Sequence, residues 1–231
     1  MTLTPPSLVA EVTRDPGAIA SAQALRGAVF HGAEGPEADD LDPVCDHVVL
    51  RDPARDGAIV GTLRIASGAA YTGREFDVGP LLATGRPLAE IGRTCLAADH
   101  RGGMAAAILF NAAFHHLRRN GVELLCGAAS LPGADPARHG TALRALRARA
   151  LAPEGLRPVA RGAGAIATTG EADPGAIRSV PSLIKAYLHA GAWVGEGAWV
   201  DHVFDTIDVC VVMDLARMRL PAATRRLEAL R

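Results

Sequence analysis

The sequence predicts a single domain of the α/β or α+β class that spans residues 1–231. Three observations lead to this prediction. Short apolar runs typical of strands alternate with longer helical segments, and a strand, a helix and a second strand follow one another in the middle of the chain. Hydrophobic residues make up 49% of the chain, which is enough for a full core at this length. The sequence contains no repeat or low-complexity segment.

The N-terminal half is predicted to hold four strands and one helix. Asp15 and Pro16 supply an N-cap and a first-turn proline for a helix that runs to about Phe30. A polar turn joins the second and third strands. A longer connection precedes the fourth strand, and a connection of that length is more often functional than filler. The strands are predicted at 7–13, 47–50, 58–65 and 88–96, and the loops at 32–40, 52–57 and 68–87.

The C-terminal half is predicted to contain three further helices and two strands. Gly121 ends the first of these helices in the C′ position, and Asp135-Pro136 opens the second. The chain is expected to be irregular from Pro153 until a short helix that Gly191 ends. The helices are predicted at 102–120, 135–150 and 182–188, the strands at 122–128 and 206–213, and a polar helix or frayed end beyond 220.

Composition limits the function and the compartment. A formal net charge of −1 gives no overall argument for a nucleic-acid partner. The four cysteines are scattered without a CxxC pair or a signal peptide, so we expect reduced core thiols in a cytoplasmic protein. No run of about 20 apolar residues exists to span a bilayer. Any membrane contact would therefore be peripheral, on the inner membrane face.

Glu90 is the most informative single residue, because it stands in an apolar strand three positions before Arg93. Removing an ionised group from water is costly, and desolvation raises a carboxylate pKa towards the range of a general base. An internal ion pair of Glu90 with Arg93 or Arg64 is the structural alternative. Pairing with Arg93 would need a bulge, which Gly92 permits.

Other polar residues give weaker indications. Asp42, Asp46 and His47 precede a strand, where aspartates are usually turn or cap residues. They lack a convincing second histidine, so we predict no metal site. Ser130, in the predicted strand-end loop 127–133, is a candidate proton donor or a backbone cap. Cys95 has no adjacent activating base, which favours core packing over nucleophilic catalysis.

A glycine-containing turn, HRGGMAA at 100–106, leads from the Glu90 strand into a helix. Exposed N–H groups at such a helix start bind phosphate groups, although many such turns only begin helices. The order of strand, Arg-Gly-Gly turn, helix and strand resembles the central motif of the GNAT acyltransferase superfamily. Arg26, Phe30, Asp42, Asp46, Arg64, Glu90 and Arg93 also resemble the polar pattern of acyl-homoserine-lactone synthases, which are GNAT relatives.

The closest resemblance is to ornithine–acyl carrier protein N-acyltransferases, which make lyso-ornithine lipid. It extends from about Leu8 to about Met218 and is carried by several blocks in order: DPVCDH at 42–47, EIGRTC at 90–95, GAASLPG at 127–133, PSLIKAYL at 181–188, GAWVG at 191–195 and FDTIDV at 204–209. Met104 replaces the third glycine of the general GNAT turn, which suits the single phosphodiester of a carrier protein better than the pyrophosphate of coenzyme A. The 32–40 loop lacks the aromatic residue expected of a lactone synthase, which counts against S-adenosylmethionine as acceptor.

This resemblance implies a central mixed, twisted sheet flanked by helices, in which two neighbouring parallel strands splay apart to admit the donor. It implies transfer of a (3-hydroxy)acyl group from acyl carrier protein to the α-amino group of ornithine. No cofactor is implied beyond the acyl-phosphopantetheine co-substrate. The carrier is acidic, so a basic docking patch is expected, with Arg118 and Arg119, or Arg144, Arg147 and Arg149, as candidates; a solvated helix face is the alternative.

The resemblance also implies roles for individual residues. Glu90 and Ser130 would be catalytic. The acceptor would be bound by Arg26, Phe30, Asp42, Asp46, Arg64 and Arg93, unless the charged members form a structural ion network. The phosphopantetheine would be bound by Thr94, Cys95, Leu96, Arg101, Gly102 and Gly103. Three alternatives stay open: the same chemistry on glutamine or lysine, a lactone synthase, and a non-catalytic module that binds acyl carrier or lipid.

Overall fold

The computed structural model describes residues 8–32, 35–101 and 103–219, and the chain divides into two structural units. Among the described residues, unit 1 comprises 8–32, 35–66, 91–101 and 103–121, and unit 2 comprises 67–90 and 122–219. The boundary crosses strand β5 (Leu88–Leu96) directly after Glu90. One domain over residues 1–231 stays a prediction.

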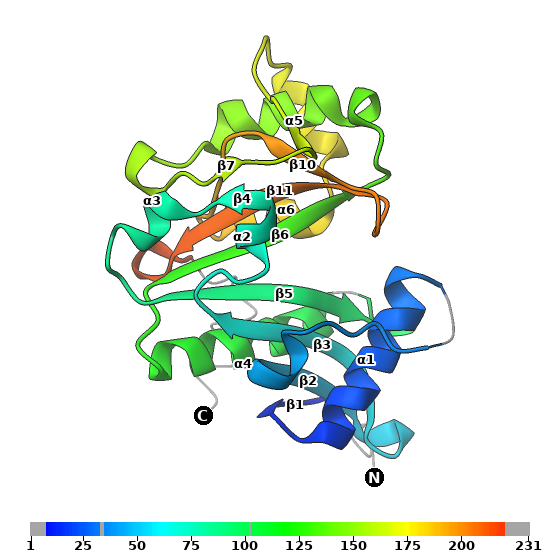
Figure 1. Cartoon of the computed structure of the whole chain (residues 1–231). Coiled ribbons are helices and arrows are strands. Elements are labelled where there is room, and N and C mark those ends of the chain that lie inside the picture. Colours follow the sequence, from blue (N-terminus) through cyan, green and yellow to red (C-terminus); the bar gives the residue numbers. More distant parts are fainter. Residues whose placement is uncertain (1–7, 33–34, 102, 220–231) are drawn as a thin grey trace. The chain divides into compact units, whose positions relative to one another are not determined.

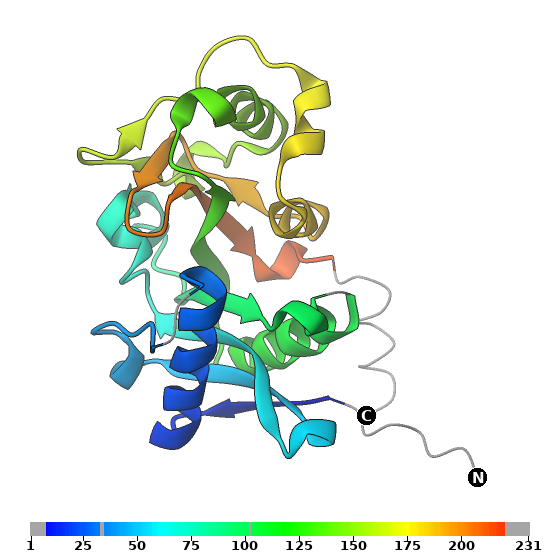
Figure 2. The same ribbon diagram turned by 90° about the vertical axis from the view of Figure 1, so that its right-hand side faces the viewer.

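Unit 1 is built on a sheet in which β1 (Val9–Thr13), β2 (Asp46–Asp52), β3 (Ala58–Ser67) and β5 are neighbours in that order (Figure 1). The β1–β2 and β2–β3 pairs are antiparallel. Helices α1 (Pro16–Phe30) and α4 (Gly103–Arg119) lie on opposite faces of this sheet (Figure 2). Two short 3-10 helices, Asp42–Val44 and Pro53–Arg55, flank β2.

Local sequence signals explain the two helices of unit 1. The Asp15 carboxylate accepts a hydrogen bond from the Ala18 N–H, which caps α1 ahead of Pro16. Helix α4 buries an apolar stripe at four-residue spacing, and this stripe faces the sheet. The stripe consists of Ala105, Leu109, Ala113 and Leu117.

Unit 2 is built on a mixed sheet. Residues 88–90 of β5 pair in parallel with β6 (Leu124–Pro132), and Glu90 is aligned with Cys126. The remaining pairs are antiparallel and follow the order β6, β11 (Thr206–Asp214), β10 (Ala198–Asp201) and β8 (Ala165–Ile166), with β9 (Trp193–Val194) also on β11. A separate antiparallel pair joins β4 (Phe76–Asp77) to β7 (Val159–Ala160).

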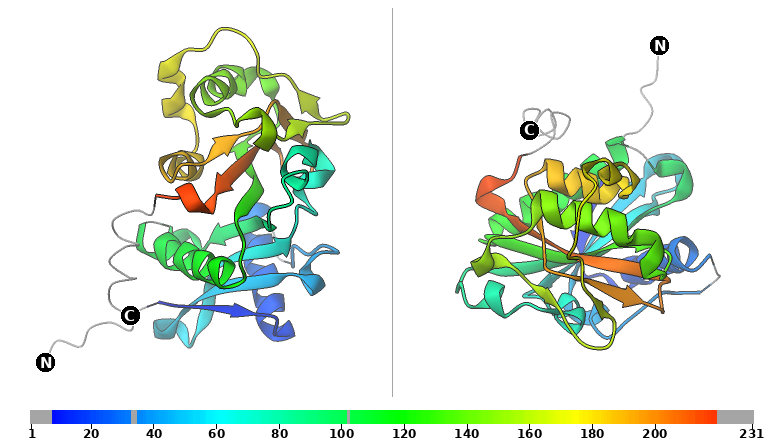
Figure 3. Two further views of the ribbon diagram at one scale, coloured as in Figure 1. Left: turned by 90° about the vertical axis from the view of Figure 1, so that its left-hand side faces the viewer. Right: turned by 90° about the horizontal axis from the view of Figure 1, so that it is seen from above.

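Helices cover both faces of the unit 2 sheet. The short helices α2 (Thr72–Glu75) and α3 (Gly79–Leu82) lie on one face, and α5 (Pro136–Ala150) and α6 (Ser182–His189) lie on the other (Figure 3). Between the sheet and α2–α3, a core cluster contains Phe76, Val78, Leu81, Cys126, Cys210 and Val212. The 3-10 helices of this unit span Glu154–Leu156, Pro174–Ser179 and Leu215–Arg217.

The long strands and helices confirm the sequence predictions, and three predictions need correction. The strand predicted at 122–128 continues to Pro132, so Ser130 lies inside β6 and not in a strand-end loop. The 68–87 connection contains α2, β4 and α3. The region between Pro153 and the helix at 182–188, predicted as irregular, holds the short strands β7 and β8, and the short strands β9 and β10 after that helix were not predicted. Strands of two to four residues show too little alternation to be detected from sequence. The predicted tail beyond 220 lies outside the described residues.

Two further predictions can be compared with the structure. All four cysteines are buried and none is part of a disulfide, which confirms the expected core thiols. Within the described part of the chain, no helix has both the length and the apolar character that a membrane span requires. The splaying of β5 and β6 beyond Glu90 stays a prediction.

Candidate functional site

The Glu90 side chain is buried in unit 2, with only 3% of its surface exposed. Its Oε2 accepts hydrogen bonds from the backbone N–H groups of Tyr71 (2.9 Å) and Thr72 (3.1 Å). These contacts attach the start of α2 to β5 and fix the orientation of the carboxylate. The predicted base is therefore buried, and two N–H dipoles stabilise its anionic form.

The sheet register places other polar residues on the same face as Glu90. Cα partners share a face, and along one strand every second residue does. Glu90 is aligned with Cys126, and the alternate β6 position Ser130 is aligned with Asp208 of β11. Ser130 is exposed, whereas Asp208 is buried. One face of the unit 2 sheet therefore carries the predicted base and the predicted proton donor.

Unit 1 contains a buried cluster in which guanidinium and carboxylate groups alternate. Arg26, with no exposed surface, donates from both Nη atoms to Asp42, at 2.9 and 2.5 Å, and its Nε lies 2.7 Å from a Glu37 oxygen. Arg64 donates to Asp42 at 2.8 Å and also pairs with Asp39. Arg93 pairs with Glu37 at 2.9 Å and with Asp39 at 3.1 Å. We call these six residues the ion-paired cluster: Arg26, Glu37, Asp39, Asp42, Arg64 and Arg93.

The ion pairs of the cluster lower the pKa of two of its carboxyl groups, those of Asp39 and Asp42. Burial alone would raise the pKa of the Asp42 carboxyl, but hydrogen bonds from Arg26, Gln23 and Arg64 hold this pKa well below its usual range. Asp39 behaves similarly: burial opposes ionisation, and Arg64 lowers the pKa. Burial also lowers the pKa of His47, whose Nε2 lies 3.0 Å from the Asp42 carbonyl oxygen. At neutral pH the Asp39 and Asp42 carboxylates are therefore held as anions.

A close approach of α1 to the following loop builds this cluster. A Cβ on Gly27 would lie 1.9 Å from the Gly35 carbonyl oxygen, so only glycine fits there. The Glu37 N–H donates to the Gln23 carbonyl oxygen at 3.0 Å, and this places Glu37 beside Arg26. The RGAVF segment that follows Leu25 thus supplies the buried guanidinium of Arg26. It also supplies Gly27, which leaves room for the following loop that carries Glu37.

Strand β5 is irregular at Arg93, which has φ = +52°. The sequence indicated Gly92 as the residue that permits a bulge, but Arg93 itself takes the left-handed conformation. The other non-glycine residues with positive φ in the described chain are Asp56 and Asp205, a residue type that tolerates this region. An arginine there is strained, and its ion pairs with Glu37 and Asp39 hold it in place.

The structure brings together four of the six predicted acceptor-binding residues: Arg26, Asp42, Arg64 and Arg93. Asp46 lies elsewhere, in a partly exposed group with Arg14 (2.5 Å) and His116 (2.9 Å). Phe30 is the last residue of α1. Their roles in binding stay predictions.

The predicted donor-binding residues follow one another from β5 into α4. Thr94 and Leu96 are half-buried, Cys95 is buried, and Arg101 is exposed. Burial raises the pKa of the Cys95 thiol to about 12, so it is protonated and unreactive at neutral pH. Gly103 is the first residue of α4, and Gly102 lies outside the described residues.

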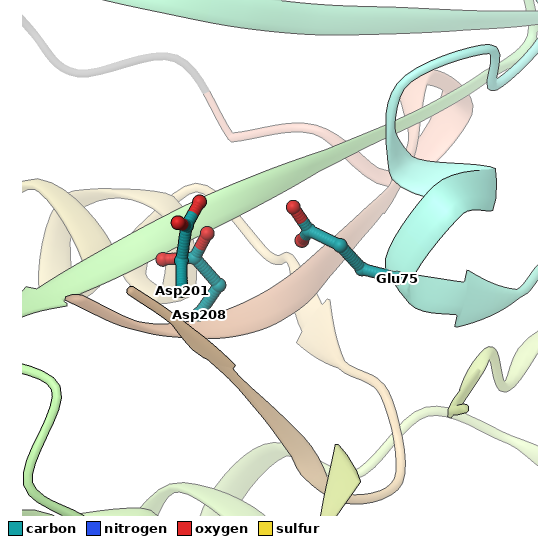
Figure 4. Close-up of side chains that lie close together, drawn as sticks. All are labelled: Glu75, Asp201 and Asp208. Atoms are coloured by element: carbon teal, nitrogen blue, oxygen red, sulfur yellow. The ribbon is translucent and has the colours of Figure 1, made fainter. Parts of the chain in front are cut away.

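Sequence reasoning missed two groups of acidic residues. Glu37 and Asp39 complete the ion-paired cluster, and the spacing of Asp39 three residues before Asp42 was the available signal. In unit 2, three buried carboxylates, those of Glu75, Asp201 and Asp208, lie together with their oxygens within 4.8 Å of one another (Figure 4). Asp208 stands in an apolar strand, which is the same signal that identified Glu90. No metal site was predicted, and this is the one candidate ligand group among the described residues.

Comparison with known proteins shows the family. Residues 24–111 match the family model described as an acetyltransferase (GNAT) domain. An L-ornithine N(alpha)-acyltransferase from Rhodobacter capsulatus is 40% identical, over 94% of this chain and 94% of its own length. The chain belongs to the L-ornithine N(alpha)-acyltransferase family. A relative with the same name from Rhizobium meliloti is 30% identical over 92% of this chain and 81% of its own length.

The fold agrees with this family membership. The crystal structure of the AHL synthase LasI is 13% identical and covers 90% of this chain and 90% of its own, with a TM-score of 0.50. The L-ornithine N(alpha)-acyltransferase family member described here thus has the GNAT acyltransferase fold, a mixed sheet flanked by helices. It is an acyltransferase, as the sequence predicted.

Proposed function

We propose that this acyltransferase moves a (3-hydroxy)acyl group from the phosphopantetheine thioester of acyl carrier protein to the α-amino group of L-ornithine, giving lyso-ornithine lipid. The observation that carries the proposal is the 40% identity, over 94% of both chains, to a relative named L-ornithine N(alpha)-acyltransferase. The buried carboxylate of Glu90 on β5 supports it, because amine acylation needs a base.

The proposed reaction begins with deprotonation of the acceptor. An α-amino group has a pKa of about 8, so at neutral pH most of it is protonated and cannot attack a carbonyl carbon. Glu90, directly or through water, accepts this proton. The amine nitrogen then forms a bond to the thioester carbonyl carbon, and the carbon–sulfur bond breaks. The thiolate leaves with a proton that Ser130 is proposed to supply. The nitrogen loses its second proton as it becomes the amide nitrogen, and this proton returns to the Ser130 oxygen, directly or through water.

The backbone of β5 is proposed to stabilise the oxyanion of the tetrahedral intermediate. The left-handed conformation of Arg93 turns the adjacent peptide groups out of the regular strand pattern. An N–H group so released can donate to an oxyanion, and each such donor is worth roughly 3 kcal/mol of transition-state stabilisation. Arg93 would then position the backbone, and its guanidinium would not contact substrate.

The contacts of the ion-paired cluster bear on how the acceptor carboxylate is bound. Arg26, Arg64 and Arg93 each already pair with two carboxylates of the cluster. Binding of an acceptor carboxylate would have to displace one of these. The contacts therefore favour a structural ion network over direct acceptor binding for these arginines.

Two groups of arginines were predicted to dock the acidic carrier protein, and their surroundings differ. Arg118 and Arg119 are exposed at the end of α4. Arg147 pairs with both oxygens of Glu196, at 2.7 and 3.1 Å, and Arg144 donates to the Glu171 carbonyl oxygen. Arg149 is exposed but stands beside these engaged arginines, so we propose Arg118 and Arg119 as the docking patch. Because the product is a lipid, we also propose that the protein contacts the inner membrane face peripherally.

The experiment is mass spectrometry of reactions that contain the purified protein, 3-hydroxyacylated carrier protein and one amino acid from a panel. We expect N-acylornithine as the main product, with glutamine and lysine as minor acceptors. A main product from another acceptor would refute the choice of ornithine. No product across the panel would favour a binding module instead of an enzyme. A parallel reaction with acyl-coenzyme A in place of the acylated carrier protein tests whether the carrier protein is required as the acyl donor.

A further inference from the structure

His100 lies directly before the predicted donor-binding residues at the start of α4, and the proposed reaction gives it no role. It ends the 3-10 helix Ala98–His100, which follows β5, and Arg101 comes next. Only 12% of its side-chain surface is exposed. A half-buried, titratable group therefore stands in unit 1, in the turn at residues 98–101 that leads into α4.

Both ring nitrogens of His100 face carboxylate oxygens. Nδ1 lies 2.8 Å from Asp99 Oδ1, and Nε2 lies 3.1 Å from Asp52 Oδ2. An ionised carboxylate only accepts hydrogen bonds, and a neutral imidazole carries a proton on one nitrogen only. Both contacts are hydrogen bonds at the same time only when both nitrogens are protonated. The geometry is therefore that of an imidazolium cation held between two anions.

The titration of these groups agrees with this assignment. Hydrogen bonds from His100 and Arg55 lower the pKa of the Asp99 carboxyl to about 2. The hydrogen bond to Asp99, together with the one to Asp52, raises the pKa of the His100 imidazole above its ordinary 6.5. Desolvation and the charge of Arg55 oppose this rise without cancelling it.

These contacts join two segments that are distant in the sequence. Asp52 is the last residue of β2, and Arg55 ends the 3-10 helix that follows it in the turn before β3. The Arg55 guanidinium pairs with Asp99, and its Nε lies 3.5 Å from Asp52 Oδ2. Two cations and two anions thus alternate at this junction. We call these four residues the His100 network: Asp52, Arg55, Asp99 and His100.

The His100 network attaches a turn that has local backbone contacts. The hydrogen bonds between β5 and β3 extend to Ala97, whose N–H donates to the Val60 carbonyl oxygen at 2.8 Å. Among the described residues, the backbone hydrogen bonds of 98–101 are local, such as that from the His100 N–H to the Ala97 carbonyl oxygen at 2.9 Å. The side chains of Asp99 and His100 therefore supply the polar contacts between this turn and the end of β2.

We propose that His100, as an imidazolium held between Asp52 and Asp99, is a positioning residue that fixes the 98–101 turn for binding of the acyl donor. The inference rests on the proposed function and extends it to the donor, because Arg101 and the start of α4 are predicted to meet the phosphodiester of the phosphopantetheine arm. Loss of one imidazole proton leaves one carboxylate facing a ring nitrogen that cannot donate, which loosens the turn. His100 does not itself contact the donor, since both of its nitrogens are engaged.

An NMR titration of the imidazole, in the protein without substrates, tests the charged state. The His100 signal is assigned by its absence from the spectrum of His100→Gln. We expect a pKa above 6.5 in the wild-type protein. Asp99→Asn keeps an acceptor oxygen but removes the charge, so it should lower this pKa. A wild-type pKa at or below 6.5, or no change in Asp99→Asn, would overturn the inference.

The kinetic test measures KM for 3-hydroxyacylated carrier protein as a function of pH. The KM of His100→Gln is divided by that of wild type, which removes the titrations that both proteins share. Because the folded-state pKa of His100 is raised, the fixed turn is complete below the ordinary value of 6.5 and is lost as the pH rises through the folded-state pKa. The ratio should therefore be about 3- to 10-fold at low pH, part of the worth of a charged hydrogen bond, and approach one at high pH.

Two comparisons separate positioning from a general loss of structure. The exposed His189→Gln in unit 2 is the matched control and should leave KM for the carrier unchanged at every pH. Asp99→Asn should shift the rise of KM with pH to a lower pH, in step with its lower imidazole pKa. A KM ratio that is independent of pH, or an effect of His100→Gln on kcat alone, would overturn the inference.

A binding measurement keeps this inference distinct from the proposed function. Fluorescence anisotropy of labelled, acylated carrier protein gives its Kd without turnover, and the Kd ratio of His100→Gln to wild type should follow the same pH dependence. Equal binding by the two proteins at all pH values would refute the role of His100. Failure of the wild-type protein to acylate ornithine would instead refute the proposed function.

Discussion

The two units handle buried carboxylates in opposite ways. In unit 1, Glu37, Asp39 and Asp42 each pair with two of the guanidinium groups of Arg26, Arg64 and Arg93. In unit 2, Glu75, Asp201 and Asp208 approach one another, and Glu90 is held by two backbone N–H groups. Charges that are mutually paired stabilise one arrangement of the chain, whereas gathered like charges favour a ligand or a proton. The paired charges of unit 1 are those expected of a structural network, whereas the second set contains Glu90, the proposed base.

The largest expected effect is the loss of activity on substitution of Glu90, which should occur without a loss of stability. Glu90→Gln keeps an oxygen that accepts the Tyr71 and Thr72 N–H groups but cannot take a proton. We expect kcat/KM to fall by about 10²- to 10⁴-fold, the usual contribution of a general base. The melting temperature should stay near that of wild type. Turnover like that of wild type at neutral pH would exclude Glu90 as the base.

The ion-paired cluster should respond in stability instead. Arg26→Met removes a fully buried guanidinium and leaves Asp42 and Glu37 without one of their partners. Breaking a buried pair from one side costs about 3–5 kcal/mol, which urea denaturation measures as a lower midpoint. The exposed pair of Arg55 and Asp99 is the control, and Arg55→Met should cost about 0–1 kcal/mol. Equal effects of the two substitutions would contradict a structural cluster.

Acid pH should weaken the same cluster. The folded-state pKa of Asp42 lies below its ordinary value of 3.8, so its contribution to stability is complete above that value and is lost as the pH falls below it. Asp42→Asn removes this titration. The stability difference between wild type and Asp42→Asn should therefore be largest near neutral pH and shrink below about pH 3.8. Chemical denaturation at several pH values measures it, and a constant difference would argue against the ion pairs.

The smallest expected effect concerns the backbone at Arg93. Arg93→Ala and Arg93→Gly both remove the guanidinium, but only glycine accepts φ = +52° without steric cost. The glycine variant should be more stable than the alanine variant by about 1 kcal/mol. At a regular strand position the order would be reversed. If alanine proves the more stable, β5 does not keep its left-handed residue without the arginine.

Much of the fold could be predicted from short-range sequence patterns. Asp15-Pro16 and Asp135-Pro136 do start helices, because the aspartate carboxylates cap the first turns. Alternation and apolar runs located β3, β5 and β11. The strands β7 to β10 were missed, since two to four residues carry little periodicity. Ser130 was misplaced for a related reason: the glycine and proline of the 127–133 segment are typical of a loop, yet the long pairing with β11 keeps the segment in β6 up to Pro132.

Residues of the candidate site could be predicted where a charged side chain stands in an apolar segment of the sequence. Glu90 stands out as a charge in an apolar strand, and the arginines of the cluster were identified through the family resemblance. Asp46 was grouped with Asp42 on nearness in sequence, whereas the structure pairs Asp46 with Arg14 and His116. Asp39 takes the place beside Asp42, because the loop after α1 turns back onto Arg26 and Arg64.

The sequence by itself determined the family, the GNAT class of fold and the position of the buried carboxylate of Glu90, since these depend on the order and type of residues along the chain. Only the tertiary structure decided which charges meet. Glu75 joins Asp201 and Asp208 across more than a hundred residues, and that meeting depends on strand register and on how α2 packs against the sheet. Local propensity carries no information about strand register or about the packing of α2, so the group of Glu75, Asp201 and Asp208 could be found only in the folded protein.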